Sequence, residues 1–171
     1  MKKIRVIAVL LALMALTLSF DACTSKAPEP DAKHSSITLI NTRTTVVTEL
    51  PKKCDYTFAD DNHTILNANG EEVGYVTTDL GVAYDDMEDD LNNPDTVRTL
   101  LKKGKLKSRN KYIAVDYNNG EIFDAIIKAN WTTCLWLDCP DKDTLFELLD
   151  IISVKTYKAE EDKTKLDWNN K

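Results

Sequence analysis

The chain has 171 residues, a formal net charge of −6 at pH 7 and 43% hydrophobic residues. This length and this hydrophobic content suit one domain with a packed core, and they exclude a mainly disordered chain. The acidic balance counts against binding to nucleic acid and against electrostatic docking on anionic lipid, because both need basic surfaces.

Residues 1–22 have the composition of an export signal. Lys2, Lys3 and Arg5 precede an apolar run from Val6 to Leu18, in which Thr17 is the one polar residue. A basic start followed by a short apolar run is typical of a secretory signal peptide, whereas a membrane-spanning helix needs about 20 apolar residues. We therefore expect residues 1–22 to be removed and the mature protein to work outside the cytoplasm.

The end of this signal, Leu18-Ser19-Phe20-Asp21-Ala22-Cys23, resembles the lipobox of bacterial lipoproteins. In that motif a small residue precedes the cysteine that receives the lipid, and Ala22 and Cys23 match it. The resemblance implies a membrane anchor at Cys23, followed by a polar, proline-bearing tether over residues 23–35. Because Asp21 departs from the motif, ordinary cleavage after Ala22, which would release a secreted protein, is the alternative.

Three cysteines follow the proposed anchor, at Cys54, Cys134 and Cys139. Cys134 and Cys139 are an odd number of residues apart, so in one strand they point to opposite faces and are poor disulfide partners unless the chain bends. Export favours oxidation. We expect one disulfide, with Cys54 bound to Cys139 in first place and to Cys134 in second.

Residues 36–158 carry the signals of a single α+β domain. Ser36–Leu50 is rich in Thr, Val and Ile, which is typical of a strand. The pair Asn69-Gly70 separates two further strand-like runs and predicts a hairpin, because glycine accepts the positive φ of a tight turn. Gly81–Asp90 is acidic and is expected to be a loop or a frayed helical turn.

Two helices are predicted from their capping residues. Residues 94–103 follow Asn93, an N-cap residue, and precede Gly104, which favours the end of a helix. Residues 140–152 begin at a proline and carry one apolar stripe, so they are predicted to form the second helix.

A meander of three antiparallel strands is predicted over 111–117, 121–129 and 131–138, with a turn at Asn118-Asn119-Gly120. The helix over 140–152 is expected to cover the side of this meander that carries Ile113 and Val115. An edge strand at 153–157 and a charged tail at 159–171 complete the chain. The expected fold is an antiparallel sheet of five to seven strands with two helices packed on one face.

The densest group of carboxylates is the first place to look for a calcium site. It consists of Asp85, Asp86, Glu88, Asp89 and Asp90. Calcium takes six to eight oxygen ligands, but the Asp-x-Asp-x-Asp-Gly spacing of a calcium loop is missing. We therefore favour a solvated acidic surface and expect no metal or other cofactor.

Aromatic residues of the meander form the main candidate for a binding surface. They are Trp131, Trp136, Tyr112 and Tyr117, joined by Tyr75 of the preceding hairpin. On an exposed sheet face such rings can stack against a sugar or a peptide. The alternative is that they pack in the core and between neighbouring strands.

The functional hypothesis that these patterns favour is a non-enzymatic module, anchored to a membrane, that binds an envelope protein or a cell-wall component. The only histidines are His34, in the predicted tether, and His63, at a turn, and no nucleophile motif accompanies them. A small hydrolase that acts on a wall polymer with a pair of carboxylates is the alternative, because such a pair is assembled only by folding.

The lipid anchor can be tested by intact mass. Protein extracted from membranes is expected to begin at Cys23 and to be heavier than its sequence by a diacylglycerol and an acyl chain, which together give stable anchoring. The Cys23→Ala variant should lack this added mass. A soluble wild-type chain that begins at Cys23 without lipid would contradict the prediction.

Overall fold

The computed structural model describes residues 26–159. The predicted signal peptide, Cys23 and the tail beyond residue 159 lie outside the described residues. The described part of the predicted tether is attached to the domain, since Ala32 O and Lys33 O accept backbone hydrogen bonds from Phe58 and Leu50 at 3.0 and 2.9 Å.

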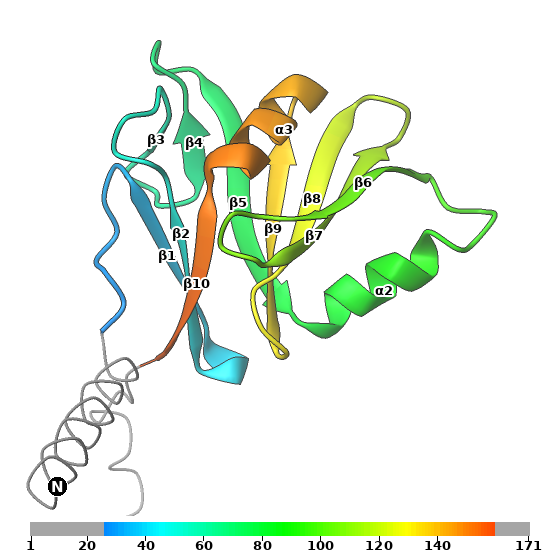
Figure 1. The fold of residues 1–171 in the computed structure, drawn as a ribbon, viewed down its shortest axis with the longest axis horizontal. Coiled ribbons are helices and arrows are strands. Elements are labelled where there is room, and N and C mark those ends of the chain that lie inside the picture. Colours follow the sequence, from blue (N-terminus) through cyan, green and yellow to red (C-terminus); the bar gives the residue numbers. More distant parts are fainter. Residues whose placement is uncertain (1–25, 160–171) are drawn as a thin grey trace, which may run out of the picture.

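The described chain is an α+β fold of two antiparallel sheets and two α-helices (Figure 1). Its elements are β1 (His34–Leu39), the 3-10 turn η2 (Ile40–Thr42), β2 (Thr44–Glu49), β3 (Thr57–Phe58), β4 (Thr64–Leu66), β5 (Glu72–Leu80), α2 (Val82–Asp90), β6 (Arg98–Lys105), β7 (Lys111–Tyr117), β8 (Ile122–Lys128), β9 (Thr133–Cys139), α3 (Lys142–Ile151) and β10 (Ser153–Lys158). The main sheet has seven strands in the order β3-β4-β5-β9-β8-β7-β6, and a smaller sheet has the order β1-β2-β10.

The two helices pack on opposite faces of the main sheet, so the prediction that both lie on one face is wrong. The helix α3 and the small sheet cover one face, where Tyr112 and Ala114 belong to the larger core. The helix α2 covers the other face, where it packs on Ile113 and Val115. The predicted helix partner of this Ile/Val side was α3. In the structure α2 packs on this side instead, although its sequence shows no amphipathic stripe that predicted such packing.

Both predicted turns are confirmed, and so is the meander of β7, β8 and β9. Gly70 has φ +79, and Asn118, Asn119 and Gly120 have φ values of 59, 57 and 93. The helix α3 begins at Lys142, slightly later than predicted, because Asp141 is its N-cap and accepts a hydrogen bond from Thr144 N at 2.8 Å.

The predicted helix over 94–103 is wrong, because this segment contains the edge strand β6, which pairs with β7. Gly104, expected to end a helix, instead lies opposite Tyr112. A Cβ atom at Gly104 would lie 2.6 Å from the Tyr112 ring, so this glycine makes room for the ring to cross β6. Lysines along the exposed edge discourage pairing with another sheet.

The strand predicted over Ser36–Leu50 is a hairpin of two strands. Its turn is η2, which ends at Arg43 in the left-handed conformation. β10 then pairs with β2 from the other side, so β10 is an edge strand as predicted, but of the small sheet. His34, expected in the tether, lies in β1.

Cys134 and Cys139 point to opposite faces of β9, as predicted. Cys134 belongs to the core beneath α2 and Cys139 to the core beneath α3. Burial raises the pKa of each thiol to about 12, which makes both unreactive. Within residues 26–159 these two and Cys54 are free, so neither expected bridge is formed in the structure and the pairing stays a prediction.

No helix among residues 26–159 is long and apolar enough to cross a membrane.

Leu148 tests the core between α3 and the main sheet. Its side chain is fully buried, so Leu148→Ala should lower the free energy of unfolding by about 3 kcal/mol through lost burial and a cavity. Urea unfolding measures this. Leu100→Ala is the matched control, because Leu100 is 46% exposed on β6 and should cost less than about 1 kcal/mol. Equal losses in the two variants would contradict the assigned core.

Candidate functional site

The helix α2 covers only part of the sheet face on which it packs. Its nine residues span roughly 14 Å, whereas the seven residues of β9 span roughly 24 Å. The covered part contains Ile113, Ile126 and Cys134, which are fully buried. Farther along β8 and β9, on the same face, lie the carboxyl groups of Asp124 and Asp138.

Asp124 and Asp138 lie directly opposite each other on neighbouring antiparallel strands. Facing residues in such a pair have Cβ atoms about 5 Å apart, so their side chains interact. Burial, followed by the charge of Asp138, raises the pKa of Asp124 to about 7. Burial also raises the pKa of Asp138.

The two carboxyl groups behave as one titrating pair. Adjacent carboxylates resist simultaneous ionisation, so the pair keeps one proton close to neutral pH. Among the described residues no donor reaches the buried Asp124 Oδ1. A hydrogen bond between the side chains of Asp124 and Asp138 contributes to the raised pKa of Asp124.

A partly buried arginine lies beside this carboxyl pair. Arg98 Nη1 is 2.7 Å from Asp90 Oδ2, and the guanidinium lies 5.3 Å from the centre of the Tyr117 ring. Its positive charge acts on Asp124 and opposes the rise of that pKa. The buried Nε of Arg98 has no acceptor within residues 26–159, so it can donate to a water molecule or to a ligand oxygen.

An open cleft of about 460 Å³ adjoins Asp138. Its lining includes Tyr75 and Ile122, which are 37% and 42% exposed, and the carboxylates of Glu72 and Glu121. The cleft therefore combines apolar surface with hydrogen-bond acceptors. That mixture is typical of sites for small polar ligands.

The aromatic residues predicted to form one platform are divided among three places. Trp136 and Tyr117 lie on the face of the carboxyl pair and flank it. Tyr112 is only 4% exposed in the core beneath α3, because the alternation along β7 turns it to the other face. Trp131 is 89% exposed in the turn between β8 and β9, at the far end of both strands. Tyr112 and Trp131 are therefore not part of a platform on this face.

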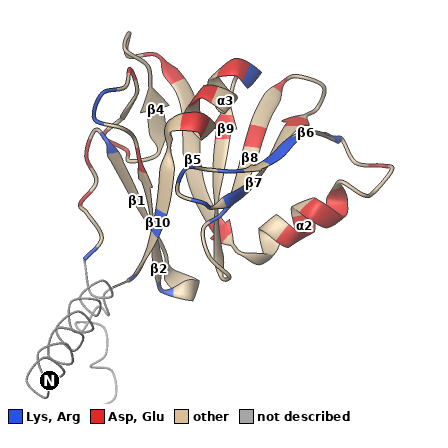
Figure 2. Cartoon of the chain, in the orientation of Figure 1, with Lys and Arg blue, Asp and Glu red and all other residues tan. Residues whose placement is uncertain are grey.

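The acidic cluster weighed as a calcium site lies in the helix α2, so of the loop and the helical turn expected for residues 81–90 the helical form is present. Three of its carboxylates form ion pairs with side chains of β8 and β6. Asp85 Oδ1 lies 2.8 Å from Lys128 Nζ, and Glu88 Oε1 lies 2.9 Å from Lys103 Nζ. Asp90 pairs with Arg98, as described above. Figure 2 shows this acidic helix beside the basic strand β6. In the part of the chain that the structure describes, no three His, Cys, Asp or Glu side chains are grouped to hold a metal ion.

The two histidines serve local structure. His63 stacks on Tyr75 with 5.6 Å between ring centres, and its Nδ1 lies 3.0 Å from Val76 O. His34 Nδ1 lies 2.9 Å from Asp31 Oδ1. Neither arrangement places an imidazole beside a hydroxyl or thiol nucleophile.

Asp124 and Asp138 were not singled out from the sequence, although a signal for them is present. The predicted meander makes β8 and β9 neighbours, and the short turn between them pairs Lys128 with Cys134. Counting outward from that turn brings residue 124 opposite residue 138. Each aspartate also interrupts an apolar strand, which is costly unless the carboxyl group has a partner.

No protein-family model, curated protein or solved structure matches the chain. The site geometry therefore carries the functional argument. It offers a proton held by two carboxyl groups, a guanidinium with an unused donor, and aromatic and apolar surface beside an open cleft.

The shared proton predicts a pH dependence of stability. The pKa of Asp124 is about 7 in the fold and 3.8 for the free side chain, so stabilisation that is complete below pH 4 is lost as the pH rises toward 7. From pH 4 to pH 8 the free energy of unfolding should fall by about 2 kcal/mol. This is roughly half of the value that the full pKa difference corresponds to, because the site is partly open to solvent, which screens the charges.

Asp124→Asn should remove this part of the pH dependence and make the protein more stable than wild type at pH 8. Urea unfolding at both pH values measures the difference. Asp150→Asn, on the exposed surface of α3, is the matched control and should follow wild type. An unchanged slope in Asp124→Asn would show that the pair does not share a proton.

Proposed function

We propose that this chain is an extracytoplasmic lipoprotein, held to a bacterial membrane through Cys23, whose domain binds a hydroxyl-rich polymer of the cell envelope without catalysing a reaction. The ligand site is the open half of the main sheet around Asp124 and Asp138. The observation that carries the proposal is a polar strip formed by Asp124, Asp138 and Arg98. It lies beyond the residues that pack under α2, and Trp136 and Tyr117 flank it.

The hydrogen-bonding groups of the strip match hydroxyl groups. A hydroxyl accepts one hydrogen bond and donates another. Arg98 Nε offers an unused donor, and the ionised member of the carboxyl pair offers an acceptor. A sugar carries several such hydroxyls on a compact frame, so one ring can use both groups.

Apolar surface beside the pair suits the C–H faces of a sugar. Tyr75 is exposed at the cleft, directly opposite Asp138 on the neighbouring strand β5. Its ring is held by the stacked His63, so little conformational freedom is lost on binding. A rigid aromatic ring next to paired hydrogen-bonding groups favours a saccharide over an extended peptide, which would need a free strand edge at the site.

Catalysis by the same carboxyl pair is the second candidate. It is favoured by the pKa of about 7 for Asp124, which leaves one acid and one base side by side at neutral pH. It ranks second because the side chains of Asp124 and Asp138 hydrogen-bond each other directly. The two carboxyl groups of glycosidases are about 5 Å apart or more, which admits the reacting centre between them.

A binding measurement separates the two candidates. The full-length chain is incubated with purified peptidoglycan glycan strands, and both the bound fraction and the release of soluble fragments are measured. Binding without release is expected. Tyr75→Ala and Asp138→Asn should each weaken binding about tenfold, equivalent to roughly 1.4 kcal/mol.

Trp131→Ala is the matched aromatic control for this experiment. Trp131 is exposed but lies at the other end of β9, so its loss should leave binding unchanged. Release of fragments that Asp138→Asn abolishes would establish the hydrolase instead. If binding fell equally in all three variants, the ligand would not bind at the polar strip.

A further inference from the structure

Exposed apolar side chains gather at one end of the domain, away from the carboxyl pair. Ile40 is 83% exposed in η2, and Trp131 is 89% exposed in the turn between β8 and β9. Leu80 and Val82, 41% and 53% exposed, lie where β5 passes into α2. Three separate loops thus present large apolar groups to solvent, an arrangement that marks an interaction surface.

Contacts between these loops hold them together as one surface, which we call the apolar end. Thr42 Oγ1 lies 3.2 Å from Thr133 Oγ1, which links η2 to the turn of Trp131. Gly81 packs so closely on that turn that a Cβ atom would lie 2.4 Å from Trp131 O. The loop positions are therefore fixed relative to one another by backbone packing.

The described chain enters and leaves the domain at this end. Ala159 N donates to Arg43 O at 2.8 Å, directly after η2. Lys26 lines the same surface hollow as Thr45 and Lys158, near the η2 ends of β2 and β10. Figure 1 shows the start of the described chain and the end of β10 on the side of the domain where η2 lies.

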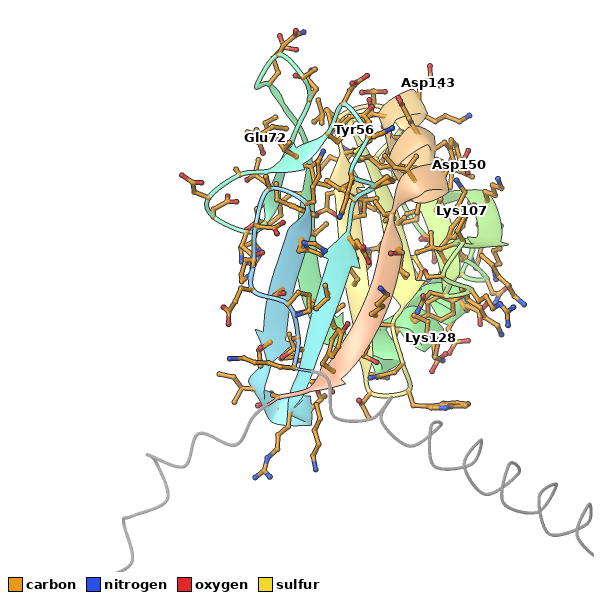
Figure 3. The ribbon with its side chains drawn as sticks, turned by 60° about the vertical axis from the view of Figure 1, so that its left-hand side comes forward. Tyr56, Glu72, Lys107, Lys128, Asp143 and Asp150 are labelled. Carbon is orange, nitrogen blue, oxygen red and sulfur yellow. The ribbon has the colours of Figure 1, made fainter. Side chains whose placement is uncertain are left out.

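Basic groups border the apolar end. Lys128 lies 5.3 Å from the centre of the Trp131 ring, and Arg109 and Lys111 line a pocket of about 350 Å³ with the same two residues. In Figure 3, Lys128 lies toward the end opposite Glu72 and Asp143. The net negative charge of the chain thus coexists with a locally basic border around an apolar surface.

We propose that the apolar end is the membrane-facing surface of the domain, with Ile40 and Trp131 seated among the headgroups of an anionic bilayer. The inference rests on the proposed lipid anchor at Cys23. The three residue steps from Cys23 to Lys26 reach at most roughly 10 Å, so an anchored chain holds this end against the bilayer.

The chemistry of the apolar end suits a bilayer surface. Tryptophan is enriched at membrane interfaces, where its ring meets the apolar boundary and its N–H meets water. Lysine and arginine beside it attract anionic headgroups over about a Debye length. The negative net charge opposes docking of the chain as a whole, and Asp85 of the acidic helix α2 pairs with Lys128 at 2.8 Å. Arg109 and Lys111 therefore supply the local attraction, while the carboxylates of α3 lie at the other end.

Quenching of tryptophan fluorescence tests the orientation. The lipidated full-length chain carrying Trp168→Phe is reconstituted into vesicles of phosphatidylethanolamine and phosphatidylglycerol, with and without lipids brominated on their acyl chains. Brominated lipid should quench the emission, and Trp131→Phe should abolish most of that quenching. Trp136→Phe should retain it, because Trp136 lies on the sheet face beside α2.

Ile40→Glu places a charge on the apolar end without touching Trp131 and should at least halve the quenching. Val97→Glu is the matched control, since Val97 is 56% exposed outside the apolar end, and it should change nothing. A chain whose mass shows the lipid but whose Trp131 is not quenched would overturn the orientation and leave the anchor intact.

Two further outcomes are distinguishable. A chain without lipid that still shows quenching sensitive to Ile40→Glu would refute the anchor and support the membrane contact of this end. Trp131 that is unaffected by brominated lipid but becomes shielded on addition of a purified envelope protein would assign the apolar end to a protein partner and overturn the proposal.

Discussion

The main sheet has apolar side chains on both faces, but the elements that pack on the two faces differ in the area that they bury. On one side α3 and the three-stranded sheet together bury an unbroken core that includes Leu135, Leu137 and Leu148. On the other side α2 is the only helix that residues 26–159 supply, and it is shorter than the strands that it crosses. A sheet face that is only half covered must be apolar under the helix and polar beyond it. The carboxyl pair lies in that polar remainder.

Unequal covering also explains why two aspartates can face each other there. In a fully closed core an ionised pair would cost several kcal/mol per charge. At the edge of the α2 contact, one shared proton removes one of the charges, and Arg98 offsets part of the other. The remaining free-energy cost lowers the stability of the fold. In return the site offers polar contacts, which an apolar pair such as two valines would not provide. The presence of the pair is thus easier to explain by binding than by stability.

The two proposed surfaces lie at opposite ends of the same strands. β8 and β9 run between the carboxyl pair and the turn of Trp131, so roughly 20 Å of rigid sheet separates a ligand at Asp138 from a bilayer at Trp131. Under both proposals together, a domain anchored through Cys23 and resting on its apolar end would direct its ligand site away from the membrane. That orientation suits a ligand that is part of a polymer beyond the bilayer, because neither surface obstructs the other.

Local chemistry within the sequence determined the turns and the strands around them. Gly70, Asn118, Asn119 and Gly120 adopt the positive φ values that glycine and asparagine tolerate, and Asp141 caps α3 within one turn of the predicted start. Only the tertiary structure decided the rest. The segment 94–103 has helix caps, but from Arg98 onward it is a strand, because the edge of β7 offers it backbone hydrogen-bond partners. Which face each helix covers, and therefore where the carboxyl pair stays open, depends on contacts between residues far apart in the chain, and no local pattern encodes them.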